Sequence, residues 1–270
     1  ASAADMIAIE REWAAKNPNL KTMTAEQAKS TLNDMSYQSL GIRSILKKYA
    51  GLINESEMNT ELDRLSQQGY RFYEDIAKYA KRNPFSQQYN LNLSNGTEKS
   101  KFYFSTTYKK DLLEDRFSKN QNLGINLRNI TQINKWLEVE MSSFLNYVDN
   151  DRQTYNVLEP GFSFLPYNPL KNDNGSNYTA HMADYMSLAN INTIKQYGLN
   201  TLDITPLDEI KNNIEQSNGF SNRSFLKLNA KIADWLSYSA SFQYEISNKK
   251  FELLYGKNSY YTRSRVNQFA

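Results

Sequence analysis

The clearest pattern in this sequence is a strict alternation of apolar and polar residues between positions 236 and 247. Six apolar or aromatic residues, from Leu236 to Ile246, occupy every second position, and six polar residues stand between them. Because successive side chains of a β-strand point to opposite faces, this period of two predicts a strand with one apolar and one polar face.

Five earlier segments show the same period, and short turn sequences such as Asn95-Gly96 join neighbouring segments into hairpins. The pattern therefore predicts a mainly β chain with an antiparallel, up-and-down sheet in which each strand pairs with the next. Six strands are fewer than the eight of the smallest membrane barrels, so the sheet should not close by itself. The predicted strands are 87–95, 101–109, 121–131, 136–148, 223–232 and 236–247.

The connections between these strands alternate in length. Those at 95–100, 131–135 and 233–235 are short, whereas those at 109–121 and 148–222 are longer. Short turns on one side and long loops on the other are typical of outer-membrane barrels. We therefore predict a transmembrane β-barrel segment over residues 87–270, with a long extracellular loop at 148–222.

Residues 1–86 contain no strand pattern and have several helix signals. Ser2 can cap a first helix, Thr24 with Gln27 and Asn54 with Glu57 have capping-box spacing, and Gly51 suits a helix C-terminus. A last helix is predicted from about Tyr70 to Lys81, ahead of Pro84. We expect a helical or irregular extracellular loop region over 1–86.

Composition narrows the function classes. The mean hydropathy is −0.71, yet 13% of the residues are aromatic, which suits a barrel with a wet interior and aromatic girdles. The formal charge of +3 comes from interspersed basic and acidic residues, which does not predict a nucleic-acid partner. The absence of cysteine excludes thiol catalysis, and no apolar run has the length of a transmembrane helix.

Several segments of the chain carry recognisable motifs. They are Phe85-Ser86-Gln87-Gln88-Tyr89 through Lys101-Phe102-Tyr103, Leu165-Pro166-Tyr167-Asn168-Pro169-Leu170, Tyr197-Gly198-Leu199, Pro206-Leu207-Asp208-Glu209-Ile210, Arg223-Ser224-Phe225, Trp235-Leu236-Ser237-Tyr238 and Asn258-Ser259-Tyr260-Tyr261. In this order they resemble the SusC/RagA family of TonB-dependent outer-membrane transporters.

This resemblance implies an internal fragment, with early barrel strands and loops, of a nutrient transporter in the bacterial outer membrane. It also implies outer-membrane lipid around a multi-pass barrel and a SusD-like surface lipoprotein as lid. Contact with TonB would be made through a part of the protein outside this chain. The cargo would be an oligosaccharide or a peptide. The alternative function is a soluble or surface-attached β-rich module that binds glycans.

The long loop contains six candidate contacts to substrate or lid: Phe162, Phe164, Tyr167, Asn168, Tyr178 and Tyr185. Aromatic rings beside amides suit sugar or peptide recognition, because a ring stacks on apolar surface while the amide binds polar groups. The alternative is that these residues pack the loop against the rest of the protein.

No catalytic constellation is predicted, and we expect no enzyme activity and no cofactor. His181 is the only histidine, so it has no histidine or cysteine partners for a metal site. Calcium ligands could come from Asp149, Asn150 and Asp151 or from Asp173 and Asn174, although ordinary turn chemistry explains them as well. Glu138 and Glu140 share one strand face, which suits lumen-facing charges.

The alternation also predicts which face meets lipid. Leu226, Leu228, Leu236, Tyr238, Ala240, Phe242 and Tyr244 are expected on the lipid side. Lys227, Asn229, Ser239, Ser241, Gln243 and Glu245 are expected on the lumen side.

Overall fold

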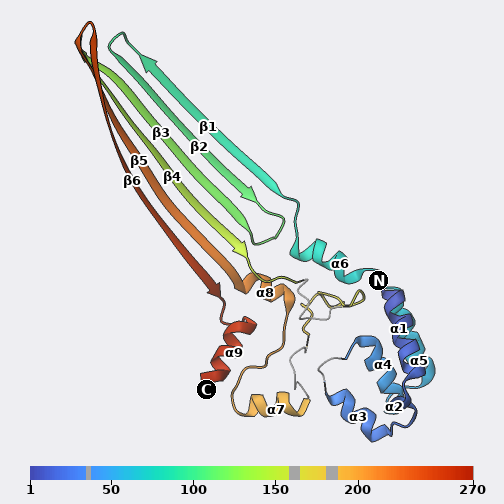
Figure 1. Cartoon of the computed structure of the whole chain (residues 1–270). Coiled ribbons are helices and arrows are strands. Elements are labelled where there is room, and N and C mark those ends of the chain that lie inside the picture. Colours follow the sequence, from blue (N-terminus) through green and yellow to red (C-terminus); the bar gives the residue numbers. More distant parts are fainter. Residues whose placement is uncertain (35–37, 158–164, 181–187, 270) are drawn as a thin grey trace. The chain divides into compact units, whose positions relative to one another are not determined.

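The computed structural model describes residues 1–34, 38–157, 165–180 and 188–269. These residues form two compact units, drawn in Figure 1. The sheet unit comprises Asn83–Gln153 and Ile214–Leu254, and the helical unit comprises Ala1–Arg82, Thr154–Asn213 and Tyr255–Ala270. Within the described residues, no helix is both long and apolar enough to cross a membrane.

The sheet unit is a single antiparallel sheet of six strands in the order β1-β2-β3-β4-β5-β6. Each strand therefore lies beside its neighbours in the chain, as Figure 1 shows, and the sheet does not close on itself. The strands are β1 (Phe85–Gly96), β2 (Ser100–Leu112), β3 (Lys119–Asn134), β4 (Leu137–Gln153), β5 (Asn213–Ala233) and β6 (Leu236–Tyr255). This confirms the predicted fold class, strand number and pairing.

Each strand extends beyond its predicted limits at one end at least, most of all β5, which begins ten residues earlier, and β6, which ends eight residues later. Residues 148–153 belong to β4 and residues 213–222 belong to β5, so the predicted loop 148–222 was too long and the connection is 154–212. The added residues are mainly charged or amide-bearing, which hides the apolar alternation. Backbone pairing does not require apolar side chains, and the ladder continues to Gln153 and Ile214.

The connections keep the predicted alternation in length with revised bounds. Residues 97–99, 135–136 and 234–235 make tight turns at one end of the sheet. At the other end, residues 113–118 join β2 to β3 and residues 154–212 join β4 to β5. The first of these longer connections is shorter than the predicted 109–121, because β2 and β3 pair up to Leu112 and Lys119.

The helical unit begins with short helices whose caps follow the sequence signals. Ser2, Thr24 and Asn54 each form the reciprocal capping box. Gly51 has φ +69°, the left-handed conformation that glycine adopts at no steric cost. The predicted last helix is α6 continued by one π-helical turn. The elements are α1 (Ala3–Lys16), α2 (Pro18–Lys21), α3 (Ala25–Asn33), α4 (Leu40–Tyr49), α5 (Glu55–Ser66), α6 (Arg71–Asp75) and η1 (Ile76–Ala80).

One apolar core joins the five helices α1 to α5, and a residue of the long connection completes it. Its members are buried aliphatic side chains together with Tyr167: Ala3, Ile7, Leu20, Ala28, Leu32, Ile45, Leu46, Ala50, Leu62, Leu65 and Tyr167. The connection is thus part of the helical unit rather than a free loop.

The rest of the helical unit consists of α7 (Leu188–Gln196), α8 (Pro206–Asn212) and α9 (Tyr260–Phe269). Glu209 of α8 accepts a hydrogen bond from the backbone N–H of Tyr260 at 2.7 Å. The guanidinium of Arg263 in α9 donates to the carbonyl oxygens of Thr201 and Asp203. The chain following β6 is therefore tied to the same connection.

We predict that Leu62→Ala destabilises the helical unit by about 2–5 kcal/mol, because the fully buried side chain leaves a cavity in the core. Leu52→Ala is the matched control, since Leu52 is exposed. Thermal unfolding of both variants checks this. Equal melting temperatures would contradict the assignment of the core.

Candidate functional site

The pairing register places the apolar residues of neighbouring strands on one face of the sheet. Directly paired residues of an antiparallel ladder share a face. Leu91 pairs with Thr106, Thr106 with Ile125, and Ile125 with Leu145. We call this the apolar face. Its aliphatic and aromatic members are Tyr89, Leu91, Leu93, Phe102, Phe104, Tyr108, Leu123, Ile125, Leu127, Leu137, Val139, Met141, Leu145, Tyr147, Phe220, Leu226, Leu228 and Ala230.

Side-chain contacts extend the same assignment to β6. Arg223 and Asn229 lie on the opposite, polar face of β5, where Arg223 binds Glu245 at 3.0 Å and Ser239 donates to Asn229 at 2.8 Å. The alternate residues Leu236, Tyr238, Ala240, Phe242, Tyr244 and Ile246 therefore lie on the apolar face. The residues of β5 and β6 that were predicted on the lipid side and those predicted on the lumen side therefore lie on opposite faces of the sheet.

The apolar face contains a wide band without charge. Every residue of these strands is described, and no Asp, Glu, Lys or Arg lies on this face from the row of Leu137 to the row of Tyr147. Ten residues of strand span about 34 Å at about 3.4 Å each. With the strand tilt of about 40° found in barrels, the band is about 26 Å tall, which matches the roughly 25 Å apolar band of outer-membrane proteins.

Aromatic residues border this band. One register row contains Tyr89, Tyr108, Leu123, Tyr147 and Phe220 in that order across five strands. The rings of Tyr89 and Tyr108 stack with centroids 6.5 Å apart. At the other end, Trp136 and Trp235 are exposed in the two tight turns. Aromatic girdles at both borders are typical of a membrane interface.

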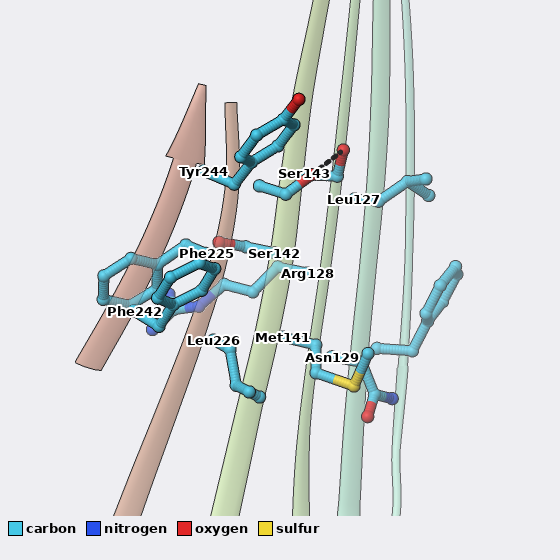
Figure 2. A pocket seen from close by; sticks show the side chains of 12 residues that line it. Leu127, Arg128, Asn129, Met141, Ser142, Ser143, Phe225, Leu226, Phe242 and Tyr244 are labelled. Carbon is cyan, nitrogen blue, oxygen red and sulfur yellow. Dashed lines mark hydrogen bonds between the residues drawn. The ribbon is translucent and has the colours of Figure 1, made fainter. Parts of the chain in front are cut away.

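A small polar cluster interrupts the apolar face near its middle. Ser143 pairs with Ser224, and both hydroxyls donate to Oδ1 of Asn222 at 3.1 and 3.2 Å. Because both serine hydroxyl groups donate hydrogen bonds within the cluster, the free-energy cost of placing these hydroxyl groups against lipid is low. A groove of about 490 Å³ includes Ser143 and Ser224 in its lining. Figure 2 shows its side chains, which include Leu127, Met141, Leu226 and Phe242 of the apolar face as well as Arg128 and Phe225 of the opposite face.

The polar face carries ion pairs that cross between strands. Arg128 binds Glu140 at 2.6 Å, and Glu138 accepts a hydrogen bond from Asn229 at 3.0 Å. The two glutamates thus share the polar face, and each has a cross-strand partner. Partly exposed pairs of this kind contribute only about 0–1 kcal/mol each, so they make the face water-compatible rather than rigid.

Three aromatic residues on the polar face were missed in the sequence. Tyr103 and Phe225 lie in one row, in which Arg128 and Ser142 stand between them, and Phe144 lies in the adjacent row, where it pairs with Arg223. They lie where polar residues are expected, and Tyr103 and Phe144 are exposed. In the sequence, each of them is an aromatic residue at a position where the alternation places a polar one. A single such residue does not indicate a site, and only the register shows that the three lie close together.

The candidate contacts in the long connection have different surroundings. Tyr167 is 1% exposed and its hydroxyl donates to Glu10 at 2.6 Å, which favours the packing alternative for this residue. Asn168 is half-buried, and its backbone N–H donates to Leu165. Tyr178 is half-buried, and burial raises the pKa of its hydroxyl. Phe162, Phe164 and Tyr185 lie outside the described residues.

The candidate calcium ligands take part in ordinary contacts. Lys119 lies 3.1 Å from Asp151 and 4.0 Å from Asp149, and Arg71 binds Asp173 at 3.0 Å. Asn174 accepts from the backbone N–H of Ser176, as in a turn. Among the described residues, no three acidic, histidine or cysteine side chains gather as a metal site would require. His181 lies outside these residues.

No model of a known protein family matches the sequence, and no characterised protein matches it. Among solved structures, the chain is similar to the RagAB peptide importer in the "closed-closed" state, with a TM-score of 0.47 and 15% sequence identity. The match covers 69% of this chain and 20% of that chain, so it is a distant structural relation to a fifth of the importer's chain. The membrane pore complex of pneumolysin has a TM-score of 0.12 and 8% identity, over 75% of this chain and 37% of that chain.

We predict that Ala240→Arg impairs membrane assembly far more than Ser241→Arg. The first places a charge within the charge-free band, where a charge costs up to about 2–4 kcal/mol at the bilayer midplane, and the second places it on the polar face. Assembly is measured as the yield of folded protein in lipid vesicles. Equal yields for the two variants would contradict the lipid-facing assignment.

Proposed function

We propose that this chain is a segment of a β-barrel in the bacterial outer membrane and belongs to a TonB-dependent transporter. The charge-free apolar band that crosses all six strands carries this proposal. Its height suits the hydrocarbon layer, its borders are aromatic, and its long side chains remain exposed. An exposed apolar surface of this extent is unfavourable in water and requires a cover.

A soluble glycan-binding module is the less favoured function. A β-sandwich buries its apolar face against a second sheet. Here Tyr238, Phe242 and Tyr244 of β6 remain exposed. The separation of short turns from long connections is also typical of barrels rather than sandwiches.

We also propose that the polar face lines the transport path and that the complete transporter works with a SusD-like lipoprotein. Tyr103, Phe144 and Phe225 offer rings for stacking beside arginine and glutamate side chains that can form hydrogen bonds. This combination suits an oligosaccharide or a peptide. The ordered motif resemblance along the chain supports the lid partner and the use of TonB. The proposal includes no catalytic step.

Tryptophan fluorescence in vesicles tests the membrane assignment, since the chain has three tryptophans in different places. Trp136 and Trp235 lie in the tight turns bordering the apolar band, whereas Trp13 belongs to α1 of the helical unit. We expect variants that retain only Trp136 or only Trp235 to be quenched by brominated lipids. The matched variant with only Trp13 should not be quenched.

The same preparation provides a second control, because a barrel segment needs detergent or lipid. Purification of the chain as a soluble monomer without detergent would overturn the membrane proposal. So would quenching that does not distinguish the turn tryptophans from Trp13.

Contact between the connection 154–212 and the lid is tested at an exposed turn. Asn172 and Ser176 close this turn by a backbone hydrogen bond of 2.9 Å, and Gly175 has φ +82°. Replacing residues 172–176 with a Gly-Ser linker in the complete transporter spares the buried Tyr167. We expect weaker lid binding and slower uptake with normal barrel assembly. Unchanged affinity and uptake would leave only a packing role for the turn.

A further inference from the structure

The most unusual contact in the helical unit joins a buried carboxyl group to the long connection. The hydroxyl of Tyr167 donates to Oε1 of Glu10 at 2.6 Å. Glu10 is only 4% exposed, although a buried glutamate normally needs a charged or strongly polar partner. The contact spans 157 positions of the sequence and attaches the connection to α1.

The surroundings of Glu10 leave its second oxygen without compensation. Among the described residues, Oε2 has no hydrogen-bond partner. It lies against the start of α4, where a Cβ atom on Gly41 would come within 1.8 Å of it. A side chain larger than that of glycine at position 41 would therefore force the Glu10 carboxyl group to shift, and this group lies between α1, α4 and the Tyr167 segment.

The nearby cations are directed elsewhere. Arg11, the next residue of α1, binds Asn59 and Asp63 of α5 at 2.8 and 2.7 Å. Arg43, on α4, donates to the carbonyl oxygen of Leu32 and to Gln38. On the third element, Tyr167 is the titratable residue, and burial raises the pKa of its hydroxyl, so it remains neutral. Among the described residues, the Glu10 carboxyl group thus has a hydrogen bond from Tyr167 and no ion pair.

We propose that Glu10 and Tyr167 form a proton-controlled latch, which fastens residues 165–167 to the helical unit while Glu10 is protonated and loosens when Glu10 ionises. A neutral carboxyl group tolerates the enclosed site, whereas a carboxylate with an unpaired oxygen needs water. The hydrogen bond from Tyr167 is stronger to the carboxylate than to the neutral acid, but it leaves the second oxygen unpaired, so the Tyr167 segment moves away and admits water. This inference does not depend on the membrane proposal.

The direction of the pH effect follows from the burial. Burial raises the pKa of Glu10 above its ordinary value, although hydrogen bonds from Ser39 and Tyr167 act in the opposite sense. A raised pKa means that the folded state binds the proton more tightly than the unfolded state. The stabilising contribution is complete below the ordinary value of about 4.3 and is lost as the pH rises through the raised value.

Neighbouring contacts limit how far the opening extends. The carbonyl oxygen of Pro166 accepts from the N–H of Phe72 at 2.9 Å, and the N–H of Leu170 donates to Asp75 at 2.7 Å. Arg71 holds Asp173. None of these contacts involves Glu10, so ionisation should loosen the Tyr167 segment while the Asp75 and Arg71 contacts persist.

Infrared spectroscopy and hydrogen exchange of the full chain in detergent test the latch. The infrared difference between wild type and Glu10→Gln isolates the Glu10 carboxyl band, which should titrate above the ordinary glutamate value. Tyr167→Phe removes a hydrogen bond that favours the carboxylate and should shift this titration to higher pH. Tyr178→Phe is the matched control and should leave it unchanged, because the pKa of Tyr178 responds to burial and to Arg43.

Hydrogen exchange reports the opening itself. In wild type, protection of residues 165–167 should fall several-fold as the pH rises through the Glu10 titration, after correction for the intrinsic exchange rate. Glu10→Gln should abolish this fall, and Glu12→Gln, at an exposed position of the same helix, should retain it. A Glu10 band that titrates at or below the ordinary value would overturn the latch. Equal pH dependence in wild type and Glu10→Gln would also overturn it.

Discussion

The cross-strand register is the constraint on which the sheet depends. The backbone hydrogen bonds between successive strands from β1 to β5 fix which residues lie side by side. A slip of one position would move a whole strand's apolar set to the other face. With the observed register, Leu91, Ile125 and Leu145 fall on the same face. The charge-free band, the aromatic row and the ion pairs of the polar face all follow from this alignment.

The helical unit is held together in a different way. Its helices are short and would be marginal alone, since helices below about 12–15 residues are marginal in water, so they depend on a shared core. Tyr167 completes that core from a distant part of the chain, and its hydroxyl brings a buried carboxyl group with it. Tyr167 therefore contributes both to the packing of the core and to the surroundings of the Glu10 carboxyl group, whereas the charge-free apolar band belongs to the sheet unit.

Particular residues show how far sequence reasoning reached. The alternation from Leu236 to Ile246 and the capping pairs at Ser2, Thr24 and Asn54 are local patterns, and both were confirmed. The end of β4 was placed too early and the start of β5 too late, because polar residues can pair as well as apolar ones. Tyr167 was a candidate contact in an open loop, but it is buried in the helical core, which no local pattern could reveal.

Period, caps and turn lengths are properties of neighbouring residues, so the sequence alone established six paired strands, one apolar face and a separate helical region. Which residues distant in the sequence lie close together was shown only by the tertiary structure. Only there do Tyr103, Phe144 and Phe225 lie in two adjacent rows, and only there does Tyr167 meet Glu10 across 157 positions. The physical reason is that local backbone preferences act over a few residues, whereas register and burial depend on which distant surfaces exclude water together.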